Sequence, residues 1–346
     1  FILNRLRPYL LIILFNIILI FFFYLFNKKF LKIILKYKLI DKPGKYKIHK
    51  TSIPVTGGII LIVGLFFYVS IFGLIFSKEN VLNKIILIFT CAGFFTFFIG
   101  LYDDILNISS KKKIIIISIF NILLFQSVEF FQLKVLIFDN SFFDFRLNII
   151  SLSIIISILS FLAYHYSLTI IDGVNGLFGV YNIIFLSTIL YFFQLDTEIK
   201  NFLLFLILIN SFITYLNLRG LLFYGNSGSL TMSSILPYIV LYIYNIREND
   251  IYFFSYLSLI LIPTLDMARL FIVRLINRKD PFSKDLNHLH HILLHKHNLN
   301  MSLIMYCSLC FIPFIISEIF KINALILIGV QISLFLFIIK DKKVKN

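Results

Sequence analysis

Apolar segments long enough to cross a membrane recur along the whole chain, and this feature most constrains the fold. A run of about 18 or more apolar residues is a candidate transmembrane helix. Eleven candidates are predicted, but the fourth and seventh are short, so the count is ten or eleven. They cover residues 9–26, 55–77, 83–101, 113–127, 148–165, 175–194, 202–218, 229–245, 251–273, 303–319 and 323–340. We therefore predict an all-α, polytopic integral membrane protein with 10–11 transmembrane helices.

The composition supports one membrane domain and excludes a soluble protein. Apolar residues make up 60% of the 346 residues and charged residues only 14%, whereas about 25% of a soluble domain is charged. No soluble domain or linker interrupts the pattern, so residues 1–346 are predicted to form a single integral membrane domain. Its three cysteines all lie in apolar segments, which favours neither a disulfide framework nor a zinc site.

Basic residues predict the orientation of the chain in the membrane. The net charge is +15, but the charges lie in short loops between the apolar segments. Taking alternate loops, one set carries 22 Lys and Arg residues and the other nine. Such an excess marks the cytoplasmic side, so we expect contacts with anionic membrane lipids and no nucleic-acid partner.

Two adjacent carboxylates, Asp103 and Asp104, follow the apolar run that ends at Leu101. Ionisable residues at a membrane boundary are functional candidates. Adjacent carboxylates repel each other, and a shared proton or a divalent cation relieves the repulsion. The alternative is a solvated turn. Lys111, Lys112 and Lys113 follow and are suited either to binding phosphate or to anchoring the loop.

Three other predicted cytoplasmic loops carry glycine or acidic residues. The first contains His49 and Pro54 and leads to Gly57-Gly58, where the lack of side chains permits a close approach by backbone or phosphate. The third is Asp172-Gly-Val-Asn175-Gly, a composition that an ordinary turn would also explain. The fourth, Gly225-Asn226-Ser-Gly-Ser, offers backbone N–H groups to an anion.

The fifth predicted cytoplasmic loop is the longest and the richest in histidine. Asp266 and Arg269 are three residues apart, so they lie on one helix face and are placed to pair. His288-Leu-His290-His291 follows. Without cysteine this pattern is weak for zinc, and binding of a sugar or phosphate fits it equally well. All these clusters fall on the predicted cytoplasmic side.

Taken together, the loops resemble those of the polyprenyl-phosphate N-acetylhexosamine-1-phosphate transferases. Individually the motifs are weak, but six in the same order are specific, and they span about residues 41 to 291. They are Asp41-Lys-Pro with His49, Pro54 and Gly57-Gly58; Gly100-Leu-Tyr-Asp-Asp104; Asp172-Gly-Val-Asn-Gly-Leu177; Gly225-Asn-Ser-Gly-Ser229; Pro263-x-x-Asp266; and Pro281-Phe with His288-Leu-His-His291. The histidine motif is similar to that of the branch using UDP-N-acetylglucosamine or a related UDP-sugar.

The resemblance implies transfer of a sugar-1-phosphate from a UDP-sugar to undecaprenyl phosphate, with release of UMP, at the cytoplasmic face of a bacterial inner membrane. This is the first membrane step of lipid-linked glycans such as cell-wall polymers and O-antigens. It also implies Mg²⁺, with Mn²⁺ as an alternative, and a homodimer as a family-level expectation. The implied catalytic residues are Asp103, Asp104 and Asp172; the metal ligands Asp103, Asp104 and Asn226; and the substrate-binding residues His49, Gly57, Gly58, Lys113, Asn175, Asp266, His288, His290 and His291.

Four positions depart from the family pattern. Tyr166 and Thr169 stand where asparagine is usual, Asn226 replaces an aspartate that binds Mg²⁺, and Leu286 stands where arginine is usual. An amide oxygen is a weaker ligand than a carboxylate for a hard cation. The alternatives are therefore a catalytically impaired member that binds UDP-sugar or prenyl phosphate without turnover and, more remotely, a membrane transporter, which would carry ionisable residues near the bilayer centre.

Overall fold

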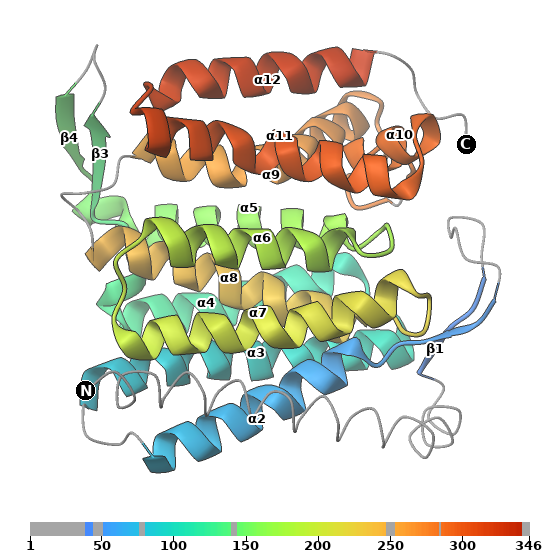
Figure 1. Cartoon of the computed structure of the whole chain (residues 1–346), viewed down its shortest axis with the longest axis horizontal. Helices are drawn as coiled ribbons and strands as arrows, with labels where there is room; N and C mark the ends of the chain where they lie inside the picture. Colours follow the sequence, from blue (N-terminus) through green and yellow to red (C-terminus); the bar gives the residue numbers. More distant parts are fainter. Residues whose placement is uncertain are drawn as a thin grey trace. The chain divides into compact units, whose positions relative to one another are not determined.

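The computed structural model describes residues 39–43, 51–75, 80–139, 144–246, 253–283 and 285–340, and this part of the chain is largely helical (Figure 1). The all-α membrane fold is confirmed. The helices are α2 (Gly57–Ile75), α3 (Asn80–Leu106), α4 (Ser110–Ser127), α5 (Ser153–Ile171), α6 (Leu177–Phe192), α7 (Thr197–Leu218), α8 (Gly225–Ile246), α9 (Phe253–Ile276), α10 (Leu289–Lys296), α11 (Leu299–Phe320) and α12 (Ala324–Lys340).

The helices agree with the predicted apolar segments. Each of the ten segments after residue 50 overlaps one helix, and the segment 9–26 lies outside the described residues. An apolar chain in lipid must pair its backbone groups internally, which makes the helix the expected form. Among the described residues, five helices are long and apolar enough to span a membrane: Lys84–Leu106, Ile150–Ile171, Thr197–Leu218, Gly225–Ile246 and Leu299–Phe320.

The chain divides into two compact units, which are described separately. Unit 1 contains the residues up to Asn107 together with Asn175–Ile235, and unit 2 contains Ile108–Val174 and the residues from Leu236 onward. In unit 1, α7 packs against α2, α3 and α6. The Tyr68 ring of α2 stacks on Phe205 of α7, with ring centroids 4.6 Å apart, so aromatic packing joins these helices.

In unit 2, α9 packs against α5, α11 and α12 (Figure 1). This unit also contains the antiparallel hairpin of β3 (Val135–Asp139) and β4 (Asp144–Asn148), which the sequence analysis did not predict. The hydroxyl of Tyr244 accepts a hydrogen bond from the Ile137 N–H at 3.1 Å and donates to the Val135 carbonyl at 3.2 Å. One tyrosine thus ties the first strand of the hairpin to α8.

Gln331 joins three helices of unit 2. Its side chain is fully buried, and its Nε2 donates to the Ser258 carbonyl of α9 at 3.0 Å and to the Leu309 carbonyl of α11 at 2.9 Å. Gln331→Leu should therefore lower the free energy of unfolding by about 1 kcal/mol, the scale of interhelical hydrogen bonds in membranes. Thermal unfolding in detergent measures the change.

Ser333→Ala is the matched control for that substitution. The Ser333 hydroxyl is exposed and bonds only to the Gly329 carbonyl of its own helix, α12. Its removal should leave the unfolding temperature unchanged, and a Gln331→Leu protein as stable as this control would contradict the interhelical role of Gln331.

Candidate functional site

Asp104 is bound to the first turn of a helix far along the chain. Its Oδ1 accepts the N–H of Asn226 at 2.8 Å, and its Oδ2 accepts the N–H of Ser227 at 2.9 Å. The first N–H groups of a helix have no partner within it, and the positive end of the helix dipole favours an anion. Asp104, in the last turn of α3, therefore caps α8 from another element of unit 1. The Asp103-Asp104 pair was predicted in a loop, but it continues the helix.

Two glycines let α3 and the start of α8 approach each other closely. Gly100 lies one turn before Asp104, and a Cβ there would stand 2.5 Å from the Ser227 Cα and overlap the Asn226 carbonyl. Gly225 has a φ of +71°, and a Cβ on it would stand 2.9 Å from Asp104 Oδ2. Any side chain at either position would push the cap away from its carboxylate.

The segment that leads into α2 pairs with the segment before α8. The Phe223 N–H donates to the Pro54 carbonyl at 2.8 Å, and the Gly57 N–H donates back to Phe223 at 2.9 Å. The Gly58 N–H then donates to the Tyr224 carbonyl at 3.0 Å. The close approach expected at Gly57 and Gly58 is thus made here by the chain's own backbone.

The same unit 1 segment is preceded by a short sheet. Strand β1 (Ile40–Asp41) pairs antiparallel with β2 (Ile53–Pro54). His49, predicted to bind substrate, lies between these strands in sequence but outside the described residues.

Asn217 connects two motif segments of unit 1 and was missed by the sequence analysis. Its Oδ1 accepts the Gly176 N–H at 2.5 Å, and its Nδ2 donates to the Leu222 carbonyl at 2.9 Å. Gly176 has a φ of +80°, a conformation that favours glycine. The predicted site residue Asn175 precedes it and is half-buried. An amide at the end of an otherwise apolar helix was the available signal.

The predicted metal ligands Asp103, Asp104 and Asn226 differ in exposure and in their hydrogen bonds. Asp103 is buried, whereas the side chain of Asn226 is exposed and both oxygens of Asp104 accept backbone N–H groups. Successive residues of a helix point about 100° apart, so Asp103 and Asp104 diverge. The described part of the chain contains no cluster of three or more His, Cys, Asp or Glu side chains suited to a metal.

In unit 2 the predicted Asp172 turn lies beside two of the predicted histidines. Asp172 ends α5, and Gly173 follows it. A Cβ on Gly173 would stand 2.9 Å from His290 Nε2 and 3.2 Å from His291 Nε2. The two ring nitrogens therefore converge on this turn, and glycine leaves room for them.

Lys113 lies in the first turn of α4 in unit 2 and is half-buried. A cation at this positive end of a helix is unfavourable by a few tenths of a kcal/mol to about 1 kcal/mol. Its position next to the membrane boundary is therefore explained either by the orientation of the chain in the membrane or by the binding of an anion.

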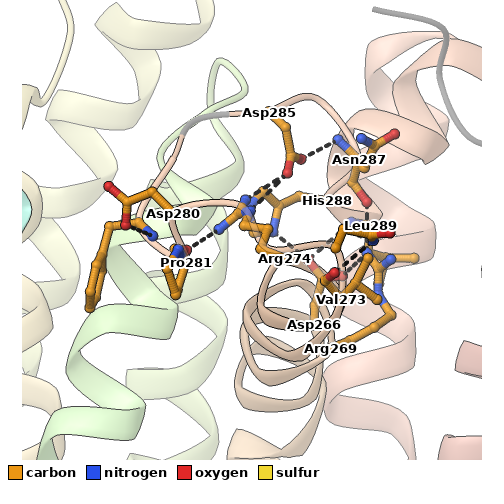
Figure 2. A network of polar contacts seen from close by, with 12 residues as sticks. Asp266, Arg269, Val273, Arg274, Asp280, Pro281, Asp285, Asn287, His288 and Leu289 are labelled. Atoms are coloured by element: carbon orange, nitrogen blue, oxygen red, sulfur yellow. Dashed lines mark hydrogen bonds and ion pairs between the residues drawn. The ribbon is translucent and has the colours of Figure 1, made fainter.

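Asp266 is the centre of a polar network in unit 2 (Figure 2). Its Oδ1 accepts from Arg269 Nη2 at 2.7 Å, which confirms the predicted pairing along α9. Its Oδ2 lies 2.9 Å from His288 Nδ1 and accepts the Leu289 N–H at 3.0 Å. The carboxylate is only 3% exposed, and its partners satisfy it in place of water.

A second ion pair holds the loop that precedes the histidines. Arg274 donates from Nε and Nη2 to Asp285 Oδ2, at 3.0 and 2.7 Å, and from Nη1 to the Pro281 carbonyl at 2.7 Å (Figure 2). Burial opposes ionisation of Asp285, but the Asn287 N–H and the Arg274 guanidinium outweigh it and hold the pKa of Asp285 below its usual value. The loop is therefore held in place by the ion pair and hydrogen bonds of Arg274, which belongs to α9.

The histidine motif forms the start of helix α10, where a loop was predicted. The rings of His288 and His290 lie parallel with centroids 5.6 Å apart, and those of His290 and His291 are 4.3 Å apart. Burial, reinforced by neighbouring histidines, lowers the pKa of His290 well below 6.5 and the pKa of His291 to about 4. Both rings are therefore neutral at pH 7, and each has one donor and one acceptor nitrogen.

The departures from the family pattern have local structural consequences. The Thr169 hydroxyl donates to the Tyr166 carbonyl of its own helix at 2.8 Å. The Tyr166 hydroxyl is buried and has no hydrogen-bond partner among the described residues. Leu286 is half-buried in the loop held by Arg274 and Asp285.

Comparison with known proteins connects this arrangement to one family. Residues 86–244 match the profile described as glycosyl transferase family 4. The undecaprenyl-phosphate alpha-N-acetylglucosaminyl 1-phosphate transferase of Yersinia pestis is 25% identical over 284 residues, which are 79% of this chain and 75% of that protein. The Escherichia coli K12 protein of the same name is 26% identical over 78% of this chain and 74% of its own length. A probable undecaprenyl-phosphate N-acetylglucosaminyl 1-phosphate transferase of Bacillus subtilis is 26% identical over 89% of this chain and 82% of its length.

Residues 86–244 of the chain are similar to glycosyl transferase family 4. This confirms the resemblance based on the loop motifs. The profile of glycosyl transferase family 4 spans the positions of Asp103, Asp104, Asp172 and Asn226 and ends before Asp266 and the histidines. This similarity and the five membrane-spanning candidates among the described residues indicate a multi-pass membrane protein.

The glycine at position 100 provides a test of the cap on α8. In Gly100→Ala the added methyl group meets the backbone of Asn226 and Ser227, which cannot move without breaking the bonds to Asp104. We expect a loss of about 2 kcal/mol in the free energy of unfolding, in the range of overpacked sites, together with faster amide hydrogen exchange at residues 226–229. Gly329→Ala in α12, with nothing within 4 Å of the added Cβ, is the control, and equal effects of the two substitutions would contradict the tight contact.

The lowered pKa of His291 predicts a pH dependence of stability. The unfolded ring has a pKa of about 6.5 and the folded ring about 4, so between these values the unfolded chain binds more protons. The stability is therefore complete above pH 6.5 and falls as the pH decreases toward 4. Unfolding temperatures across this range should fall less steeply in His291→Gln than in the unchanged protein. The exposed His295 provides the matched substitution, and equal slopes in His291→Gln and His295→Gln would contradict this origin of the pH dependence.

Proposed function

We propose that this protein transfers a sugar-1-phosphate from a UDP-sugar to undecaprenyl phosphate and releases UMP. The observation that carries the proposal is the similarity to transferases named for undecaprenyl phosphate and N-acetylglucosamine over about three quarters of both chains. N-acetylglucosamine-1-phosphate is accordingly the first group to test. No observation favours a transporter or a binding protein without turnover.

The chemistry proposed is a displacement at phosphorus. A phosphate oxygen of undecaprenyl phosphate attacks the phosphorus that carries the sugar, the bond from that phosphorus to the bridging oxygen breaks, and UMP leaves with the bridging oxygen. Such reactions depend on alignment and on stabilising negative charge. In this proposal Asp103 and Asp172 serve the reacting groups, and the neutral His290 and His291 contact the sugar phosphate through hydrogen bonds.

The proposal includes a divalent cation, Mg²⁺ or Mn²⁺, that enters with the substrate. Mg²⁺ is commonly held by one or two carboxylates and by the phosphates of the substrate rather than by a complete protein site. This agrees with a chain in which Asp104 is occupied by backbone N–H groups and Asn226 is neutral. The diphosphate of the UDP-sugar would supply most of the ligands.

The proposed location is the bacterial inner membrane, with the site on the cytoplasmic face, where the basic loops are predicted. Hydrophobic undecaprenyl phosphate reaches the site from the bilayer and the UDP-sugar from the cytoplasm. A homodimer and the assembly of the whole chain into one membrane domain remain predictions. Delivery of the lipid-linked sugar to O-antigen or cell-wall glycans also belongs to the proposal.

The decisive experiment measures UMP release by purified protein in detergent. It uses undecaprenyl phosphate, a panel of UDP-N-acetylhexosamines and a titration of Mg²⁺. Turnover with one sugar supports the transferase and identifies its donor. Cooperative unfolding on heating shows that the purified protein is folded. If such protein shows no turnover with any donor, the transferase proposal fails and a non-catalytic family member is favoured.

Asn226→Asp tests the effect of the neutral residue at this position. A carboxylate there would join the first turn of α8 and add a strong ligand for a hard cation. We expect half-maximal UMP release at a Mg²⁺ concentration at least about tenfold lower, since each 1.4 kcal/mol of added binding changes an affinity tenfold. Asn226→Ser is the control without a carboxylate. A lower rate of Asn226→Asp at every Mg²⁺ concentration would show that residue 226 does not face the cation.

A further inference from the structure

His288 is held on both sides by partners that reach it from α9. On the side-chain side, its Nδ1 lies 2.9 Å from Asp266 Oδ2. On the backbone side, the same oxygen accepts the Leu289 N–H at 3.0 Å, and Arg269 Nη2 donates to the Asn287 carbonyl at 2.6 Å. The residues before and after His288 are thus bound to Arg269 and to Asp266, and Asp266 also contacts the ring (Figure 2).

The partners of Asp266 determine which nitrogen of His288 carries a proton. An arginine side chain remains charged in proteins and only donates hydrogen bonds, so Arg269 at 2.7 Å stabilises Asp266 as a carboxylate. A carboxylate only accepts. The contact with His288 therefore requires a proton on Nδ1, whether the ring is neutral or charged.

We propose that Asp266 is a positioning residue that keeps a proton on Nδ1 of His288 and leaves Nε2 as the nitrogen that serves the substrate. Hydrogen bonding at one ring nitrogen sets the role of the other. In the neutral ring Nε2 is an acceptor for a hydroxyl of the sugar nucleotide, and it becomes a donor to phosphate only when the ring is charged. This role rests on the proposed transferase function, but the proton position itself does not.

The surroundings of His288 make this arrangement specific. The neutral ring of His290 lies parallel to His288, and Asp285 and His291 interact with it electrostatically. Tyr306 of α11 lies beyond, with its ring centroid 6.4 Å from that of His290. Among these described residues, Asp266 is the one within hydrogen-bond distance of a ring nitrogen of His288, so it is the group that fixes the tautomer.

Nuclear magnetic resonance of the full chain, labelled with ¹⁵N only in histidine and held in detergent, tests the proton position directly. Nitrogen shifts and couplings distinguish the two tautomers, and His288→Gln assigns the signal. The His288 signal of the unchanged protein should show the proton on Nδ1. Loss of the Nδ1 proton in the unchanged protein would overturn the proposal without any variant.

Asp266→Asn should release this constraint. The amide group can donate to Nδ1, so the His288 signal should shift toward the tautomer with the proton on Nε2. Asp280→Asn is the matched control, because Asp280 is exposed, lies in the same segment and bonds only locally to the Phe282 N–H. An unchanged His288 tautomer in Asp266→Asn, or an equal change in Asp280→Asn, would overturn the proposal.

Activity gives a second readout. UMP release by Asp266→Asn should show a kcat about tenfold or more lower, the usual loss when the partner that orients a functional histidine is removed, with KM for the UDP-sugar changed much less. A loss confined to KM would contradict positioning of the reacting group. If the unchanged protein released no UMP, the proposed function would fail, whereas the proton position of His288 would still be decided by its spectrum.

Discussion

A buried carboxylate on an apolar helix must be satisfied without bulk water, and this requirement organises the motif segments of the protein. In unit 1 Asp104 meets it with two backbone N–H groups from the first turn of α8. In unit 2 Asp266 meets it with the Leu289 N–H at the start of α10, together with Arg269 and His288. The first N–H groups of a helix need an acceptor as much as a buried carboxylate needs donors. The carboxylate and the first turn of the helix therefore each supply the hydrogen-bond partners that the other would lack when buried.

The pairing of a carboxylate with the first turn of another helix also determines where small residues are required. A cap supplied by another helix brings two backbones together, so Gly100 and Gly225 have no room for a side chain. The same applies to Gly58, whose N–H bonds to Tyr224 beside the cap. In unit 2 Gly173 leaves space for the ring nitrogens of His290 and His291. The glycines belong to the architecture of the site, whatever substrate it binds.

The sequence predicted the helices and the important residues better than it predicted their partners. Apolar length identified the spans because the bilayer leaves the backbone few alternatives, and the i,i+3 spacing identified the pair Asp266–Arg269. The cap of Asp104 was not predictable, because its donors lie 122 and 123 residues away and are backbone groups without a residue signature. Asn217 was missed for a similar reason, since its partners are the Gly176 N–H and the Leu222 carbonyl. The β3–β4 hairpin was missed because its two five-residue strands are short beside apolar runs of membrane-spanning length.

The cap on α8 gives a physical account of how the chain tolerates Asn226. The start of α8 carries the equivalent of about half a positive charge, and Asp104 supplies one full negative charge beside it. A second carboxylate at position 226 would make this end of α8 strongly negative and would require a cation to relieve the repulsion. With an amide there, the N-terminus and Asp104 together leave only about half a negative charge, so the fold needs less compensation at this point. Under the proposed function, the diphosphate of the substrate would supply to the cation the negative charge that the amide of Asn226 lacks.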